Sequence, residues 1–221
     1  MAPTAADALL CGDPSRALAI AQVLLTQPRM SNHHRGLWGY HGETASGMEL
    51  TVQATGIGGP SAAIVVGELA GLGMRRAIRV GTCAALGPSP GTGTILVAER
   101  AVASDGTSAA LGIEPGAEVK PDLELTGAML AGGRAEPVVV VSRDLPPGAL
   151  PPGPAESGVK LVGDLQTAGL LAAASAGGVR AAAGLVVGSA DGRRLEDEPL
   201  ESGLLQLARI AGEALESLNL N

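Results

Sequence analysis

Short apolar runs alternate with longer amphipathic stretches along this chain. The runs have the length of β-strands and are bounded by glycine, proline or polar residues, whereas the longer stretches repeat their apolar positions at helical spacing. Such alternation is typical of an α/β protein, in which helices cover a sheet. We therefore predict a single α/β domain over residues 1–221, with a central mixed β-sheet flanked by helices.

The same pattern predicts the individual elements. The strands are residues 8–11, 48–55, 76–82, 94–99, 137–142 and 181–189, and the helices are residues 14–27, 60–72, 121–132, 164–177 and 199–218. The last helix has the clearest apolar stripe, because leucine and alanine recur at steps of three and four residues. Residues 104–120 and the proline-rich residues 143–157 lack such a period and are predicted to be loops.

Composition and charge narrow the class of protein. With 221 residues and 46% hydrophobic content, the chain is long enough for one sizeable core. The formal net charge is -7, and no basic tract offsets it, so we expect no nucleic-acid partner. No apolar run is long enough to span a membrane, and the N-terminus lacks the pattern of a secretory signal. We therefore expect a cytoplasmic protein with no membrane partner.

Thiol and imidazole groups give no sign of a metal centre. Cys11 and Cys83 are far apart in the sequence, and His33, His34 and His41 lack the spacing of metal ligands. We predict reduced cysteines, no disulfide framework and no metal site.

The segment CGDPSRA, residues 11–17, is the first candidate for a binding site. A short strand meets a glycine, an Asp-Pro turn and an arginine at the start of a helix. Free backbone N–H groups, the positive end of the helix and the Arg16 guanidinium would together hold an anion. The alternative is a plain helix cap, with Asp13 as the capping residue and Pro14 as the first helical residue.

Three further segments carry glycines or arginines at similar places. HHRGLWGYHG, residues 33–42, contains Arg35, although a β-hairpin with a surface arginine would give the same pattern. TGIGGPSAA, residues 55–63, is a strand that ends in glycines before a helix, which lets a ligand approach the backbone closely. IRVGTCAALG, residues 78–87, places Arg79 and Thr82 near the carboxyl end of a strand, where ligands of open α/β sheets bind.

Taken in order, these four segments resemble the nucleoside phosphorylase family that contains uridine phosphorylase and the hexameric bacterial purine nucleoside phosphorylases. The resemblance continues through GDLQTAGLLAAASAGGVRAAAGLVVGSAD and covers nearly the whole chain. It implies cleavage of a nucleoside by inorganic phosphate as co-substrate, with no metal or organic cofactor. Thr82 and the segment ASAGGVRA are closer to the uridine-type branch.

The resemblance also implies roles for individual residues. The phosphate site would consist of Gly12, Arg16, Arg79 and Thr82, completed by Arg35 of a neighbouring subunit. The sugar site would consist of Ile57, Leu165 and Gln166, and the base site of Cys83 and Ala84. Arg79 would also be catalytic. Because three guanidinium groups on one site would repel one another without a dianion, their presence favours phosphate over water as the nucleophile.

A shared phosphate site implies a homo-oligomer. If Arg35 completes the site of a neighbour, the functional unit is at least a dimer. The family usually builds a hexamer as a trimer of such dimers.

The chain departs from the family pattern on the sugar side. DLQTAG, residues 164–169, matches a family segment written Glu-Met-Glu, whose second glutamate grips the ribose hydroxyls, and here that position is Gln166. The amide loses the charge-assisted hydrogen bonds of a carboxylate. We expect weaker ribose binding, an altered sugar preference or loss of activity.

The base side departs as well. Asp191 in VVGSADGRR is a candidate catalytic acid on the base, but Asp-Gly is also a turn signal, and an ungapped count puts Ser189 at the position of the acid. The histidine that relatives contribute near the N-terminus is missing, as is the phenylalanine that stacks on the base. The sequence therefore does not indicate which base is used.

Three hypotheses remain open at this point. The first is a nucleoside phosphorylase, the second is an N-ribosyl hydrolase on the same scaffold, and the third is a degenerate, non-catalytic paralogue that binds phosphate or a nucleotide.

Overall fold

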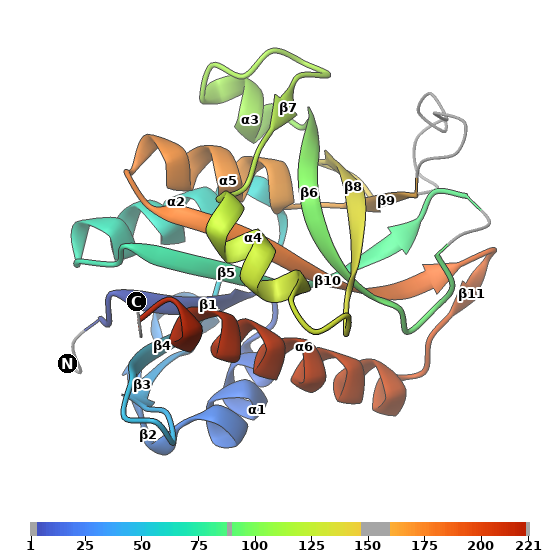
Figure 1. The fold of residues 1–221 in the computed structure, drawn as a ribbon. Coiled ribbons are helices and arrows are strands. Elements are labelled where there is room, and N and C mark those ends of the chain that lie inside the picture. Colours follow the sequence, from blue (N-terminus) through green and yellow to red (C-terminus); the bar gives the residue numbers. More distant parts are fainter. Residues whose placement is uncertain (1–3, 88–89, 147–159, 220–221) are drawn as a thin grey trace.

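The structure is a computed structural model that describes residues 4–87, 90–146 and 160–219 (Figure 1). The strands are β1 (Asp7–Cys11), β2 (Thr26–Asn32), β3 (Gly39–Glu43), β4 (Glu49–Ala54), β5 (Arg76–Ala85), β6 (Ile95–Ser104), β7 (Glu118–Val119), β8 (Glu136–Arg143), β9 (Leu161–Asp164), β10 (Arg180–Ala190) and β11 (Arg193–Arg194). The helices are α1 (Pro14–Leu24), α2 (Gly58–Gly71), α3 (Gly106–Ala110), α4 (Leu123–Leu130), α5 (Thr167–Ala176) and α6 (Asp197–Ser217), and a 3-10 turn, η1, covers His34–Gly36.

All of these strands belong to one mixed sheet, in which β5 is the junction. On one side of β5 the sheet continues through β1, β4, β3 and β2. On the other side, β5, β10, β6, β8 and β9 pair in turn until β9 returns to β5, so these strands form a closed ring. The strands β4, β1, β5 and β10 run parallel, and their carboxyl ends therefore lie at the same edge.

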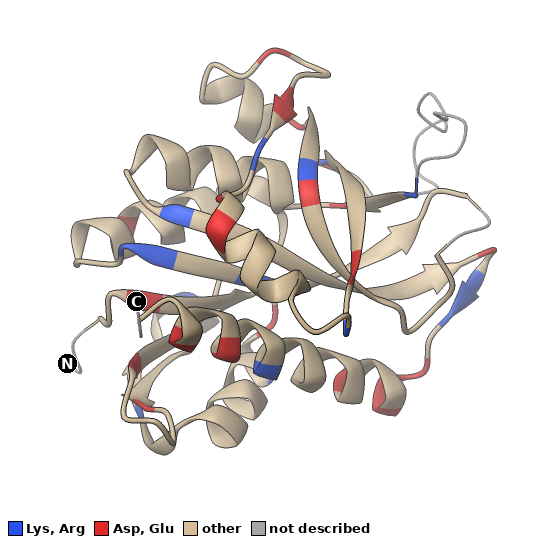
Figure 2. Ribbon diagram, in the orientation of Figure 1, with Lys and Arg blue, Asp and Glu red and all other residues tan. Residues whose placement is uncertain are grey.

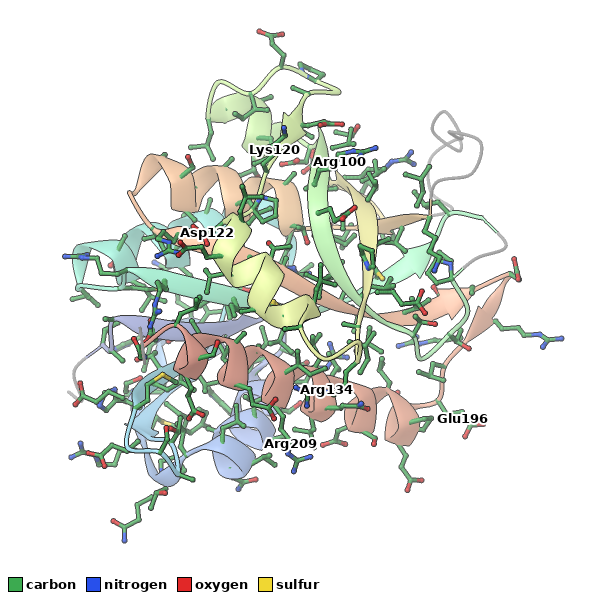
Figure 3. The ribbon with its side chains drawn as sticks, viewed as in Figure 1. Arg100, Lys120, Asp122, Arg134, Glu196 and Arg209 are labelled. Carbon is green, nitrogen blue, oxygen red and sulfur yellow. The ribbon has the colours of Figure 1, made fainter. Side chains whose placement is uncertain are left out.

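Helices cover both faces of the sheet (Figure 1). One core lies between the sheet and helices α2 and α5, and α3 packs against these two helices. The other core lies between the sheet and helices α1, α4 and α6. Asp122 caps α4 and pairs with Arg180 at the start of β10, which ties that helix to the sheet (Figure 3).

The observed elements confirm the predicted α/β class with its mixed, helix-flanked sheet. Each predicted strand and helix is present with shifted ends. Helix α1 ends at Leu24 because β2 begins at Thr26, and β2 escaped prediction because its sequence, TQPRMSN, is polar. Helix α5 begins at Thr167 because Asp164 ends β9.

The prediction of a loop over residues 104–120 was wrong. Asp105 accepts a hydrogen bond from the Ser108 N–H and so caps the short helix α3, and β7 pairs with β6. Of the predicted loop 143–157, residues 147–157 lie outside the described residues. Among the helices that the structure describes, none is both long enough and apolar enough to cross a membrane.

Candidate active site

A cavity of about 480 Å³ lies at the carboxyl ends of the parallel strands. Its walls come from the turns after β1 and β4, the second half of β5, the junction of β9 and α5, and the end of β10. Because this is the edge at which ligands of α/β sheets bind, and the volume suits a small molecule, the cavity is the candidate active site.

The cavity brings together most of the residues singled out from the sequence. Its lining includes Gly12, Arg16, Ile57, Arg79, Thr82, Cys83, Ala84, Leu165 and Gln166. These residues come from turns and strands that are far apart in the sequence. Their roles towards phosphate, sugar and base remain predictions, but the fold places all of them around one space.

The turn between β1 and α1 is shaped by Asp13, as the helix-cap interpretation expects. Its Oδ1 accepts hydrogen bonds from the backbone N–H groups of Ser15 (2.8 Å) and Arg16 (3.2 Å). Burial alone would raise the pKa of Asp13, but hydrogen bonds from Ser15 and the Arg16 N–H lower it overall. Among the described residues, the Arg16 guanidinium has no salt bridge, so its charge is available to a ligand in the cavity.

Arg79 is almost fully buried, with 4% of its surface exposed. Its Nη2 pairs with Asp164 Oδ2 at 3.0 Å, its Nη1 donates to Gln166 Oε1 at 2.7 Å, and its Nε donates to Thr167 Oγ1 at 3.2 Å. The sequence-based expectation of repulsion among three guanidinium groups is therefore corrected, because Asp164 already balances the charge of Arg79. Repulsion among the arginines is therefore weaker support for phosphate as the nucleophile than the sequence indicated.

Gly81 makes this position of Arg79 possible. A Cβ atom added at Gly81 would lie 2.6 Å from Arg79 Cζ and Nη2, which is closer than such atoms approach in proteins. The guanidinium thus lies against the strand backbone two residues further on, and a glycine at 81 is required for that contact.

The Gln166 side chain is buried and uses both ends of its amide. Nε2 donates to the backbone oxygens of Gly56 (2.6 Å) and Gly58 (3.1 Å), while Oε1 accepts from Arg79. Gly56 has φ +74°, a conformation that favours glycine. A Cβ at Gly12 would lie 3.2 Å from Gly56 O, so the two turns are in close contact here.

Arg35 and Asp191 are outside this cavity. Arg35 is exposed in η1 and lines a second cavity of about 1090 Å³ beside α2. Asp191 is exposed in the turn between β10 and β11, with φ +50°, as the Asp-Gly turn signal predicts. The described chain therefore does not bring Asp191 to the predicted base site.

The two thiols are buried and protonated. Burial raises the pKa of Cys11 to about 12 and raises that of Cys83 further above its usual range. Neither thiol is activated as a nucleophile. No group of three or more His, Cys, Asp or Glu side chains suited to a metal ion occurs in the part of the chain that the structure describes.

Two charged lining residues had not been given a role from the sequence: Asp164 and Arg194. The sequence could have indicated a role for Asp164, because a carboxylate between an apolar run and a helix is expected to be buried and to need a partner. Nothing in the sequence indicated Arg194, because only the pairing of β11 with β10 brings it to the cavity.

Comparison with known proteins gives matches in sequence and in structure. Residues 7–212 match the family model described as the phosphorylase superfamily. A DeoD-type purine nucleoside phosphorylase from Oceanobacillus iheyensis is 42% identical over 94 residues, which are 42% of this chain and 40% of that protein. Uridine phosphorylase from Salmonella typhimurium is 41% identical over 101 residues, 46% of this chain and 39% of that protein. The matched part thus spans less than half the length of either curated relative.

A solved structure extends the likeness to the whole fold. Uridine phosphorylase from Vibrio fischeri, solved with 6-hydroxy-1-naphthoic acid, superposes with a TM-score of 0.81 at 22% sequence identity. The superposition covers 97% of this chain and 92% of that one. At this identity the match shows a shared fold.

Proposed function

The chain belongs to the phosphorylase superfamily, and from this membership and the geometry of the cavity we propose that it is a nucleoside phosphorylase. Inorganic phosphate attacks C1′ of a nucleoside, the N-glycosidic bond breaks, and a free base and a pentose 1-phosphate are released. Phosphate is the co-substrate, and no metal or organic cofactor enters the reaction. The observation that carries the proposal is that one cavity contains two of the three arginines predicted for phosphate, Arg16 and Arg79, together with the residues predicted to contact sugar and base.

The phosphate is proposed to bind between Arg16 and Arg79. Arg16 is unpaired among the described residues, and a guanidinium with five N–H groups retains two after the three hydrogen bonds of Arg79. Thr82 on β5 and the backbone of Gly12 complete the site. Asp164 acts through Arg79: it orients the guanidinium and limits the repulsion between the two cations when the site is empty.

The sugar is proposed to lie between the phosphate and β5. Ile57 and Leu165 supply apolar contacts, and Gln166 Oε1 retains one lone pair after its bond with Arg79. Holding phosphate and C1′ in line converts a reaction of two molecules into one within a complex, and the nearby cations favour the developing charge. Thr82 and the relatives named uridine phosphorylase support a uridine-type enzyme.

The proposal includes a homo-oligomer. The smallest functional unit is a dimer, and by family resemblance the assembly is a hexamer built as a trimer of dimers. Arg35 is exposed, and the second cavity that it lines also contains Ile64 and Leu72 of α2, whose side chains are 67% and 65% exposed. Exposed apolar side chains beside an exposed cation are typical of a protein interface. This face would bring Arg35 to the phosphate site of a second copy.

An assay of base release tests the proposed function. Purified protein is incubated with uridine, thymidine, inosine, adenosine and cytidine, each with and without inorganic phosphate, and free base is measured. We expect release that requires phosphate. Arg16→Met should raise the KM for phosphate by about tenfold or more, because a charge-assisted bond is lost, whereas Arg209→Met on the exposed side of α6 should not change it.

Two other results would overturn the proposal. Release of base without phosphate would identify an N-ribosyl hydrolase. No release from any nucleoside, with phosphate still raising the melting temperature, would identify a non-catalytic binding protein.

A further inference from the structure

We propose that the sugar side of the cavity prefers 2′-deoxyribonucleosides to ribonucleosides, and that the hydrogen bonds of Gln166 to the protein set this preference. The inference rests on the proposed phosphorylase function and deepens it by naming the class of sugar. Gln166 lines the cavity beside Arg79, and the other residues proposed for the sugar, Ile57 and Leu165, are apolar.

The Gln166 amide has one hydrogen-bonding position left for a ligand. Nε2, which carries two N–H groups, donates to Gly56 O at 2.6 Å and to Gly58 O at 3.1 Å. Of the two lone pairs on Oε1, one accepts from Arg79 Nη1 at 2.7 Å. A bound sugar can therefore use a single acceptor of this side chain and no donor.

The amide cannot turn to offer more. Exchanging its two ends would place Nε2 against the Arg79 guanidinium and Oε1 against two carbonyl oxygens, so three hydrogen bonds would become repulsive contacts. Gln166 is only 3% exposed, which leaves the side chain little room to move. A ligand therefore meets the amide in this orientation.

No carboxylate is available to the sugar hydroxyls in the part of the chain that the structure describes. The acids that line the cavity there are Asp13 and Asp164. Asp13 caps α1 beside Arg16, at the end proposed for phosphate. Asp164 accepts from Ser142 Oγ on one oxygen (2.6 Å) and from Arg79 Nη2 on the other (3.0 Å). The acids of α6, which Figure 2 shows along that helix, do not line the cavity.

The stereochemistry of phosphorolysis brings the sugar hydroxyls to this side. In a β-nucleoside the base lies on one face of the sugar ring, so phosphate attacks C1′ from the opposite face. The 2′- and 3′-hydroxyls of ribose lie on that opposite face, and the 2′-hydroxyl is on the carbon next to C1′. A phosphate held by Arg79 therefore places these hydroxyls near Gln166, the hydrogen-bonding neighbour of Arg79.

A count of partners then favours the deoxy sugar. Ribose brings two neighbouring hydroxyls to one free acceptor, whereas 2′-deoxyribose brings one. The N–H groups that Arg79 retains are proposed to bind phosphate, so they do not serve the second hydroxyl. A hydroxyl that is removed from water without a partner weakens binding.

The neutral charge of Gln166 acts in the same direction during the reaction. The 2′-hydroxyl withdraws electrons from C1′, which becomes more positive as the base departs. A carboxylate beside the ring would offset that loss, and a neutral amide offsets it less. Ribonucleosides should therefore lose in kcat as well as in KM.

The first test compares substrates that differ only in the 2′-hydroxyl. Uridine is compared with 2′-deoxyuridine, and inosine with 2′-deoxyinosine, at saturating phosphate. Because each pair shares its base, the preference for a base cancels. We expect kcat/KM to be about tenfold or more higher for the deoxy member of each pair that is cleaved, since its sugar leaves no hydroxyl without a partner.

Arabinosyluracil separates the position of the hydroxyl from its electron withdrawal. Its 2′-hydroxyl has the same effect on C1′ but lies on the face of the base, away from the attacking phosphate. Inhibition constants are measured against cleavage of thymidine, whose product thymine is distinguished from uracil. Arabinosyluracil should bind more tightly than uridine, because its 2′-hydroxyl does not face Gln166.

A variant tests the role of Gln166 itself. The wild type should favour 2′-deoxyuridine over 2′,3′-dideoxyuridine by about tenfold in kcat/KM, because the 3′-hydroxyl uses the free lone pair. Gln166→Met should remove this preference. Ser142→Ala alters the same corner of the fold without touching the cavity and should keep it. The comparisons of substrates need no variant, so they hold even if Gln166→Met folds poorly.

The outcomes distinguish the two proposals. If nucleosides are cleaved only with phosphate but ribonucleosides are cleaved as well as their deoxy counterparts, the inference is wrong and the proposed function stands. Arabinosyluracil that binds no better than uridine, or a Gln166→Met variant that keeps the preference for the 3′-hydroxyl, would also overturn it. If no base is released with phosphate, the proposed function fails and the inference fails with it.

Discussion

Gln166 is neutral at a position where a carboxylate would face three other groups. Its Nε2 donates to Gly56 O and Gly58 O, so the amide connects the turn before α2 with the buried Arg79. A glutamate could accept from Arg79 but could not donate to either carbonyl oxygen. These hydrogen bonds give a structural reason for an amide at position 166, and the sequence alone did not reveal it.

We therefore expect Gln166→Glu to destabilise the fold rather than to improve it. Two backbone oxygens, 2.6 Å and 3.1 Å from Nε2 in the present structure, would face a carboxylate oxygen. The loss should be about 1 to 3 kcal/mol in the free energy of unfolding, measured by urea denaturation.

Gln166→Met is the matched control, since it removes the amide but adds no charge. It should be less destabilising than Gln166→Glu if repulsion contributes. The expectation would be contradicted if Gln166→Glu were as stable as the wild type and its kcat/KM for ribonucleosides were higher by about tenfold or more. That result would show that the missing carboxylate limits sugar binding.

At the scale of secondary-structure elements, Asp164 connects three strands and one helix. It ends β9 and accepts hydrogen bonds from the Thr167 N–H and hydroxyl at the start of α5, from Ser142 Oγ of β8 at 2.6 Å, and from Arg79 of β5. Asp164 is 4% exposed as a whole residue. The corner of β9 and α5 thus depends on a buried charge that has a partner for each oxygen.

Asp164→Asn should destabilise this corner strongly. Arg79 would remain buried without a carboxylate, and such a loss costs about 3 kcal/mol or more in the free energy of unfolding. Urea denaturation gives the value. Ser142→Ala removes only a neutral donor from the same carboxylate and should cost about 1 kcal/mol. Equal stability of Asp164→Asn and the wild type would contradict the assigned ion pair.

At the scale of the whole molecule, the proposed phosphate groups and Arg35 line different cavities. The first contains the proposed phosphate groups, and the second contains Arg35 next to the apolar surface of α2. Within the described chain, Arg35 does not line the first cavity. The proposed dimer is the arrangement in which Arg35 of one copy serves the site of the other.

Mixing two inactive variants tests this arrangement. Arg16→Ala damages the cavity of its own subunit, and Arg35→Ala damages that of its neighbour. After subunit exchange, half of the dimers would be mixed and would contain one intact site, so about a quarter of wild-type activity should return. Each variant incubated alone is the control. A protein that stays monomeric at assay concentrations, or variants that never complement each other, would overturn the shared site.

Much of the fold could be predicted from the sequence because apolar periodicity is a local property. Every predicted strand and helix exists, but β2, β3, β7, β9 and β11 were not predicted. Strand β2 is polar, and β7 and β11 have only two residues each. Such strands form because a neighbouring strand offers its backbone hydrogen bonds, not because of their own side chains.

The sequence by itself determined the order of elements and the segments that end at the cavity, because strand–turn–helix motifs fix local geometry. Only the tertiary structure decided which charges meet there. It pairs Arg79 with Asp164, 85 residues away, leaves Asp191 outside the cavity and brings Arg194 to the cavity lining through the pairing of β11 with β10. Those outcomes depend on burial and on contacts between distant segments, and a linear pattern of residues contains neither.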